Sequence, residues 1–181
     1  MLIEQPTYRL RRIGVASSGT ASSANNLGPM TYTTADGRQQ LLDAIARAIE
    51  EIGVALASLG EAYELLDEHN ADRLEQELFR PVQAAYGRAQ RTYAEFADRH
   101  DFPGRTFAPA SPGAPSTGAK GFIDGAVDAA GRADGELAAL QDSMLPVEVG
   151  DAELRAGLQA VRELLDQIRG RARELVRTLG R

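Results

Sequence analysis

Apolar residues recur at steps of four and three through most of the chain after residue 36. An α-helix turns once in about 3.6 residues, so this spacing places the apolar side chains in one stripe along a helix. A stripe this narrow is typical of helices that pack nearly parallel to their neighbours. The pattern therefore predicts an all-α protein. The longest uninterrupted run is Leu154, Leu158, Val161, Leu165, Ile168, Ala172, Leu175 and Leu179.

Breaks in the stripes mark the ends of the predicted helices. The stripe shifts at Asn70 and Asp72, which suit the end of one helix and the N-cap of the next. Pro81 lacks a backbone N–H and should kink the second helix, or split it into a short connector (72–79) and a longer piece (80–100). The predicted helices span about 36–70, 72–100, 119–144 and 151–179.

Polar residues support the predicted starts and the order of the helices. Asp36 or Thr34 is the expected N-cap of the first helix, and Asp151 that of the fourth. With a short connection inside each hairpin, the helices predict an antiparallel up-down-up-down four-helix bundle over residues 34–181. Residues 101–118 contain four prolines and three glycines, which exclude a regular helix or strand. They predict a long Pro-rich crossover loop between the two hairpins.

The first 33 residues differ from the rest of the chain. No acidic residue occurs between Glu4 and Asp36, and Arg9, Arg11 and Arg12 lie close together. The second half of this segment is rich in Ser, Thr, Gly and Asn, which favours irregular chain. Residues 1–33 are therefore predicted to form an extended basic N-terminal arm outside the bundle.

Composition excludes several kinds of chemistry. The chain has no cysteine, so disulfides, thiolate catalysis and cysteine-ligated metals are ruled out. A net charge of −6 argues against general nucleic-acid binding. No apolar run approaches the roughly 18 residues of a membrane-spanning helix, so we expect no transmembrane segment. The expected location is the cytoplasm, with export through the Arg11-Arg12 pair as the alternative.

No set of residues matches a catalytic, cofactor or metal site, so we predict no enzyme and no cofactor. The two histidines, His69 and His100, lie near predicted helix C-termini, where they would cap free carbonyls. Neither belongs to the Glu-x-x-His motif of di-iron bundles. The segment 118–122 has glycines and a lysine but lacks the spacing of a phosphate-binding loop.

Charge is unevenly distributed along the sequence. Seven acidic residues between Glu61 and Glu77 are opposed only by Arg73, whereas five arginines from Arg169 to Arg181 surround Glu174. An up-down-up-down order puts the two groups at opposite ends, so it predicts an electrically bipolar molecule. Solvated surface is the alternative interpretation. The predicted partner-binding residues are Arg9, Arg11, Arg12, Glu64, Asp67, Glu68, Arg169, Arg173 and Arg177.

Small residues predict close approach by the third helix. Gly121, Gly125, Gly131 and Gly135 all fall inside it, although each glycine costs up to about 1 kcal/mol relative to alanine. They favour close backbone contact, either inside the bundle or with a partner.

The leading hypothesis is a non-enzymatic structural or protein-interaction bundle that self-assembles through its arm and charged poles. The arm and the Pro-rich loop would contact neighbouring molecules. The first alternative is a small-molecule or lipid binder with a cavity beside Phe122, Tyr86 and Tyr93. The second starts from Tyr63 and Asp67, which form a Tyr-x-x-x-Asp pattern. This pattern resembles the secretion signal of type VII substrates, which are helical hairpin proteins, and implies export. Because Tyr63 also lies on the apolar stripe, core packing explains it without further assumptions.

Overall fold

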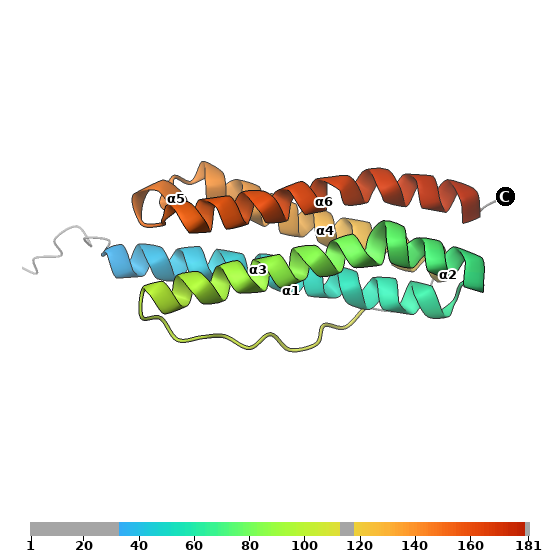
Figure 1. The fold of residues 1–181 in the computed structure, drawn as a ribbon, viewed down its shortest axis with the longest axis horizontal. Helices are drawn as coiled ribbons and strands as arrows, with labels where there is room; N and C mark the ends of the chain where they lie inside the picture. Colours follow the sequence, from blue (N-terminus) through green and yellow to red (C-terminus); the bar gives the residue numbers. More distant parts are fainter. Residues whose placement is uncertain (1–32, 113–117, 180–181) are drawn as a thin grey trace, which may run out of the picture. The chain divides into compact units, whose positions relative to one another are not determined.

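The computed structural model describes residues 33–112 and 118–179, so nearly all of the predicted N-terminal arm lies outside it. The all-α prediction is confirmed, since the described residues form helices and loops and contain no strand. Their order along the chain is shown in Figure 1. The elements are α1 (Thr34–Glu64), α2 (Glu68–Leu74), the π-helix η1 (Glu75–Phe79), α3 (Arg80–Arg99), α4 (Gly118–Asp142), α5 (Leu145–Glu148) and α6 (Ala152–Leu179).

Side-chain caps begin α1 and α6. Asp151 is the N-cap of α6 as predicted, and its Oδ1 accepts the Leu154 N–H at 2.7 Å. The N-cap of α1 is Thr33, not Thr34 or Asp36. Asp36 instead completes a capping box, in which each side chain accepts a bond from the backbone N–H of the other residue.

The first helix ends earlier than predicted. Helix α1 stops at Glu64, and Asp67, not Asp72, is the N-cap of the following helix. The Asp67 carboxylate accepts the Asn70 backbone N–H at 3.1 Å and its side-chain N–H at 2.6 Å. These local bonds satisfy donors that a continuous helix would satisfy through its backbone. The apolar stripe passes through the turn and therefore concealed it.

The irregularity predicted at Pro81 appears as a π-helix just before it. At the end of η1, the Arg80 N–H donates a hydrogen bond to the Glu75 carbonyl, five residues earlier, which is the spacing of a π-helix. Pro81 follows in the first turn of α3, and the chain stays helical through this junction, because Phe79 and Arg80 both have right-handed helical backbone angles. Its missing N–H thus falls directly after the shifted backbone bonds of η1. At the other connection, Met144 has φ 64°, a left-handed conformation that ends α4 before the short helix α5.

All four pairs of neighbouring long helices are antiparallel, but their order is not the predicted one. Arg47 bonds Glu136 and Arg132 bonds Glu51, so α4 runs opposite to α1. Helix α3 also runs opposite to α1, because the two form a hairpin through α2. Hence α3 and α4 point the same way, and the order is up-down-down-up (Figure 1). The up-down-up-down prediction is wrong.

The loop after α3 explains this order. It runs back along α1, where Arg105 contacts Glu50 at 2.6 Å and Ala110 lies close to Gly53. Phe107 packs edge-on against Tyr93 of α3, with ring centroids 5.6 Å apart. An extended segment of this length spans more than the roughly 30 Å of a 20-residue helix. The described part of the loop thus contacts its own bundle, although we expected it to reach neighbouring molecules.

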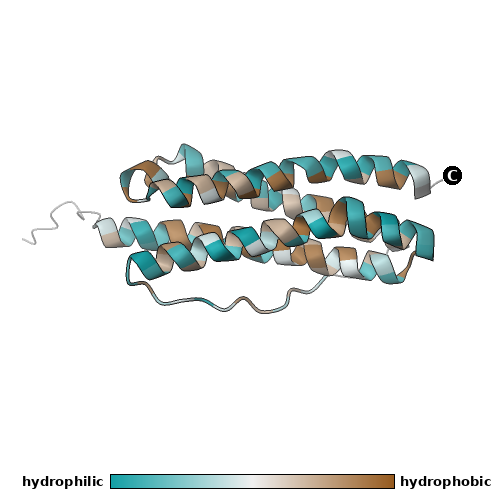
Figure 2. Ribbon diagram, in the orientation of Figure 1, coloured by the Kyte–Doolittle hydropathy of each residue, from teal (hydrophilic) through white to brown (hydrophobic). Residues whose placement is uncertain are grey.

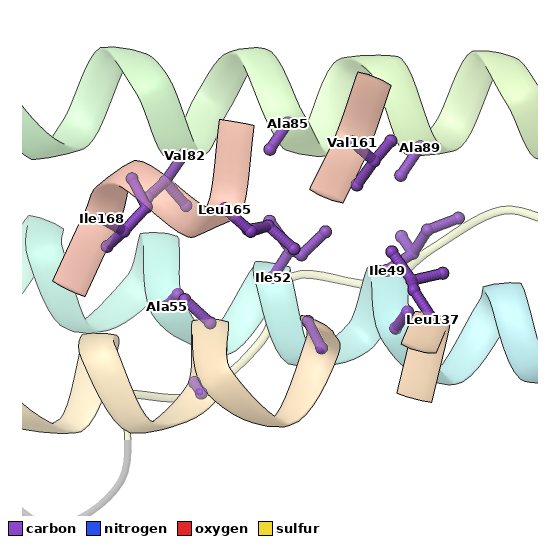
Figure 3. Packing of buried hydrophobic residues seen from close by; sticks show 14 of the residues in the cluster. Ile49, Ile52, Ala55, Val82, Ala85, Ala89, Leu137, Val161, Leu165 and Ile168 are labelled. Atoms are coloured by element: carbon purple, nitrogen blue, oxygen red, sulfur yellow. The ribbon is translucent and has the colours of Figure 1, made fainter. Parts of the chain in front are cut away.

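One apolar core lies between the helices, whose hydrophobic sides face inward (Figure 2). Ile49 and Ile52 of α1 meet residues of the other three long helices there (Figure 3). Helices α1 and α4 approach over the longest stretch, and α3 and α6 come next. Both α1 and α4 carry many buried alanines, which allow close packing. These are Ala44, Ala46, Ala48, Ala55 and Ala62 on α1, and Ala126, Ala129, Ala130 and Ala133 on α4.

Candidate functional site

The acidic and basic groups of the sequence lie at the same end of the bundle. In the observed order, the end of α1, the helix α2, the start of α4 and the end of α6 come together. A direct link is the bond from Arg73 Nη1 to Thr178 Oγ1, at 2.6 Å. The prediction of an electrically bipolar molecule is therefore wrong, and head-to-tail stacking through charged poles loses its basis.

Two of the three predicted acidic binding residues have a local explanation. Asp67 is the N-cap of α2 and Glu68 its first residue, so both stabilise the positive end of that helix. Hydrogen bonds from the Asn70 side chain and backbone lower the pKa of Asp67 below its usual value. The predicted first helix, 36–70, would have placed both carboxylates at its negative end, but α1 already ends at Glu64. Glu64 alone remains at the C-terminal end of α1.

Glu64 lies in a groove between α1 and the chain segment that returns from α2. The groove has a volume of about 370 Å³. Tyr63 and Phe79 provide its aromatic surface, and a Cβ on Gly60 would have no atom within 4 Å. The lining residues are Gly60, Tyr63, Glu64, Glu75, Phe79, Arg80 and Gln83. We call this site the Tyr63 groove.

Tyr63 does not occupy the core as its place in the stripe predicted. It is 39% exposed, and the adjacent Leu65 is 57% exposed. The opposite wall contains the π-helix, a feature that often marks functional sites in helices. Arg80 is held on that wall by Glu75, whose Oε1 accepts bonds from Arg80 Nε at 3.1 Å and Nη2 at 2.8 Å. Glu64 has no ion-pair partner among the residues that the structure describes.

A second groove, of about 460 Å³, lies between α4 and α6. It brings together three predicted binding residues, Arg169, Arg173 and Arg177, which form one wall. Asp124 and Asp128 of α4 stand on the opposite wall, and Val127, Ala172 and Val176 complete the lining. A pocket of about 130 Å³ continues from it past Gly131. We call this site the α4–α6 groove.

Known proteins do not identify the chain. No protein-family model matches it, and neither does any curated protein or solved structure. The remaining predicted site residues, Arg9, Arg11 and Arg12, lie outside the described residues. The geometry of the two grooves is therefore the basis for a functional proposal.

The two histidines have different surroundings. His69 is the second residue of α2, so the predicted C-terminal cap is wrong for it. His100 is the C-cap of α3, as expected, and its Nε2 lies 3.4 Å from Asp151 Oδ2. Burial alone would raise the pKa of Asp151. Bonds from Arg99, at 2.9 and 3.0 Å, and from the Leu154 N–H outweigh burial and lower it.

Asp151, Arg99 and His100 form a cluster, the Asp151 cluster, that has a structural role. The Asp151 carboxylate caps α6 and binds Arg99 at the end of α3, so it links the two helices. Within residues 33–112 and 118–179, no group of three acidic, histidine or cysteine residues is arranged to hold a metal ion. No described helix has an apolar stretch of the length that a bilayer crossing requires.

Sequence reasoning missed residues in both grooves. Gly60, Phe79 and Gln83 belong to the Tyr63 groove but have no charge or motif that singles them out. Asp124 and Asp128 were not among the charged residues selected as candidates. Their spacing of four, matched by Arg169 and Arg173, could have suggested two charged columns. The antiparallel hairpin predicted for these two helices already brings the columns to the same height, and in the structure both columns line one groove.

Proposed function

We propose that this protein is a four-helix bundle that acts by protein–protein interaction and not as an enzyme. Its Tyr63 groove binds a short partner segment that combines a bulky apolar side chain with lysine or arginine. The observation that carries the proposal is the exposure of Tyr63 beside Phe79 in a groove with an acidic side. The experiment is a peptide selection against this groove.

The aromatic residues support an apolar anchor in the ligand. Tyrosine and phenylalanine offer large, rigid contact surfaces, and hot spots of binding are enriched in tyrosine. The open space above Gly60 leaves room for a side chain of the partner. An exposed aromatic surface of this kind in a hollow is typical of a recognition site.

The charges support a basic ligand. Arg80 is bonded to Glu75, which leaves Glu64 to attract a positive group. A lysine or arginine next to the anchor would therefore meet complementary charge, which increases specificity and the rate of association.

The test is a random peptide library selected on the full-length chain. We expect the enriched peptides to contain arginine or lysine next to a bulky apolar residue. Tyr63→Ala should weaken their binding at least about fivefold, the effect of roughly 1 kcal/mol. Glu64→Gln should weaken it less and reduce its salt dependence. Gly60→Leu, which places a side chain in the groove, should abolish it.

Matched control variants lie beside the groove. Leu65→Ala removes an exposed apolar side chain, and Glu61→Gln removes a carboxylate, but neither residue lines the groove. Both should bind the peptides with little change, and circular dichroism should show an unchanged helix content in every variant. Enriched peptides without basic residues, or peptides that bind Tyr63→Ala normally, would contradict the proposal.

Export through a type VII-like signal is a second candidate, favoured by the exposure of Tyr63, since a signal must be accessible. Its test is secretion of Tyr63→Ala and Asp67→Ala chains by a type VII-competent host. Loss of secretion in both variants supports it, and normal secretion contradicts it.

The small-molecule or lipid hypothesis gains less support, because Tyr93 and Phe122 are only 5% and 6% exposed and belong to the packed core.

A further inference from the structure

The α4–α6 groove has walls of opposite charge at matching heights. Arg162 bonds Asp134 at 2.7 Å, which sets the register of the two antiparallel helices. From that point, each step toward the start of α4 corresponds to a step toward the end of α6. Asp128 and Asp124 therefore lie level with the stretch that carries Arg169, Arg173 and Arg177, and all five line the same groove.

These charges are not paired across the groove. Asp124 bonds Lys120 on its own helix at 2.6 Å, and Arg177 bonds Glu174 on its own helix at 2.6 Å. Both are exposed pairs within one helix, which contribute little to stability, so these side chains can pair with another molecule instead. Within the described part of the chain, the other three charged residues of the walls form no ion pair. These are Asp128, Arg169 and Arg173.

Apolar surface lies between the walls. Val127 and Val176 are partly exposed in the groove, next to the buried Ala172. The described lining comes from α4 and α6 alone, whereas the crossover loop contacts the α1–α3 side of the molecule. A hydrophobic strip bordered by complementary charge is typical of a protein interface.

We propose that a second copy of this chain covers the α4–α6 groove, related by a two-fold axis parallel to the helices. Such an axis places α4 of one copy opposite α6 of the other without changing height. The acidic wall of each copy then faces the arginine wall of its partner, and the apolar strips meet near the axis. A two-fold interface requires this kind of self-complementary surface.

The charges favour a second copy over a simple ion. An anion drawn to the arginines would approach Asp124 and Asp128, and a cation would meet the opposite conflict. A second copy provides both signs at the heights where they are needed. This interface does not involve Tyr63 or Glu64, so it stands independently of the proposed peptide-binding function.

The test uses two variants in which one sign of charge dominates the groove. Asp124→Arg with Asp128→Arg makes both walls positive, and Arg169→Asp with Arg173→Asp makes both walls negative except at Arg177, which is paired with Glu174. The molar mass of each full-length chain is measured by light scattering over a range of concentrations. We expect dimers of the wild-type chain that weaken with added salt. Each variant alone should dimerise at least about tenfold more weakly, because like charges oppose each other.

The decisive sample is an equal mixture of the two variants. Their faces are complementary, so the mixture should recover the dimer, which also shows that both variants fold. A control with the same change of charge is Glu95→Arg with Asp98→Arg on the exposed side of α3, and it should dimerise as the wild-type chain does. A wild-type monomer at all concentrations would overturn the proposal. So would dimers of either variant alone at wild-type affinity, or a mixture that remains monomeric.

Discussion

The bundle contains two closely packed helix pairs and two looser contacts between them. The close pairs are α1 with α4 and α3 with α6, neither of which is adjacent in sequence. The looser contacts are α1 with α3 and α4 with α6, and the two proposed binding grooves lie along them. Pockets at the close pairs occur toward their ends, beside α5 and beside η1.

Side-chain size explains the difference. Where two helices both present small residues, their backbones approach and leave little space. Gly157 of α6 faces Thr92 of α3 in this way, and the buried alanines of α1 and α4 allow the same. Where long arginines or large aromatics border a contact, the helices cannot close over them. Small residues therefore bring α4 close to α1, whereas the arginines of α6 border a groove on the other side of α4.

The largest effect is expected from overpacking the α1–α4 contact. Ala133 is fully buried on the stretch of α4 that Arg132 and Glu136 link to α1. Ala133→Leu should lower the free energy of unfolding by about 1–3 kcal/mol, because the close backbones leave no room for a larger side chain. Urea denaturation measures this change. Ala139→Leu, on an exposed position of the same helix, is the control and should change stability by less than about 0.5 kcal/mol.

A similar effect is expected at the α3–α6 contact. A Cβ on Gly157 would lie 2.6 Å from Thr92 Cγ2, so Gly157→Ala forces the helices apart. We expect a loss of about 1–3 kcal/mol in the free energy of unfolding. Adding Thr92→Ala should recover part of it, since the clashing atoms are removed. Denaturation of the four proteins of this double-mutant cycle gives the coupling; additive effects would argue against the contact.

The Asp151 cluster tests the same helix pair through pH. The pKa of Asp151 is lowered in the folded state. The ionised carboxylate therefore stabilises folding at pH values above the pKa of an aspartate in the unfolded chain, about 3.9. This stabilisation is lost as the pH falls through the folded pKa. Asp151→Asn keeps a capping side chain but loses the charge, and should cost roughly 1 kcal/mol at neutral pH. The difference from wild type in urea denaturation should shrink as the pH is lowered below about 4.

The smallest effect is expected on the looser side, and with opposite sign. A Cβ on Gly131 would meet only the flexible end of Arg169, at 3.3 Å, and one on Gly135 would meet no atom within 4 Å. Gly131→Ala and Gly135→Ala should each stabilise the protein by up to about 1 kcal/mol, because alanine favours the helix. Thermal unfolding measures the gain. A loss at Gly131 comparable to that at Gly157 would show that the two contacts do not differ as described.

The helices themselves follow from local sequence. The apolar stripes predicted the all-α class, and capping chemistry placed the start of α6 at Asp151. The turn at Asp67 was missed because the stripe of α1 runs through it, although its Asp-x-x-Asn spacing is a local signal. Glu64, Arg169, Arg173 and Arg177 were selected as charged candidates, and the structure places each of them in a groove.

Helix order is what the tertiary structure decided. The stripes determine which side of each helix is buried. They do not determine whether α4 runs parallel or antiparallel to α1. Non-local contacts of the crossover loop, such as Arg105 with Glu50 and Phe107 with Tyr93, accompany the return of the chain along α1 before α4 begins. That choice brings the acidic residues of α1 and α2 to the same end as the arginines of α6, whereas the α4–α6 hairpin alone sets Asp124 and Asp128 opposite the arginines. Periodicity along one helix encodes burial, whereas the direction of its neighbour depends on contacts between residues far apart in the chain.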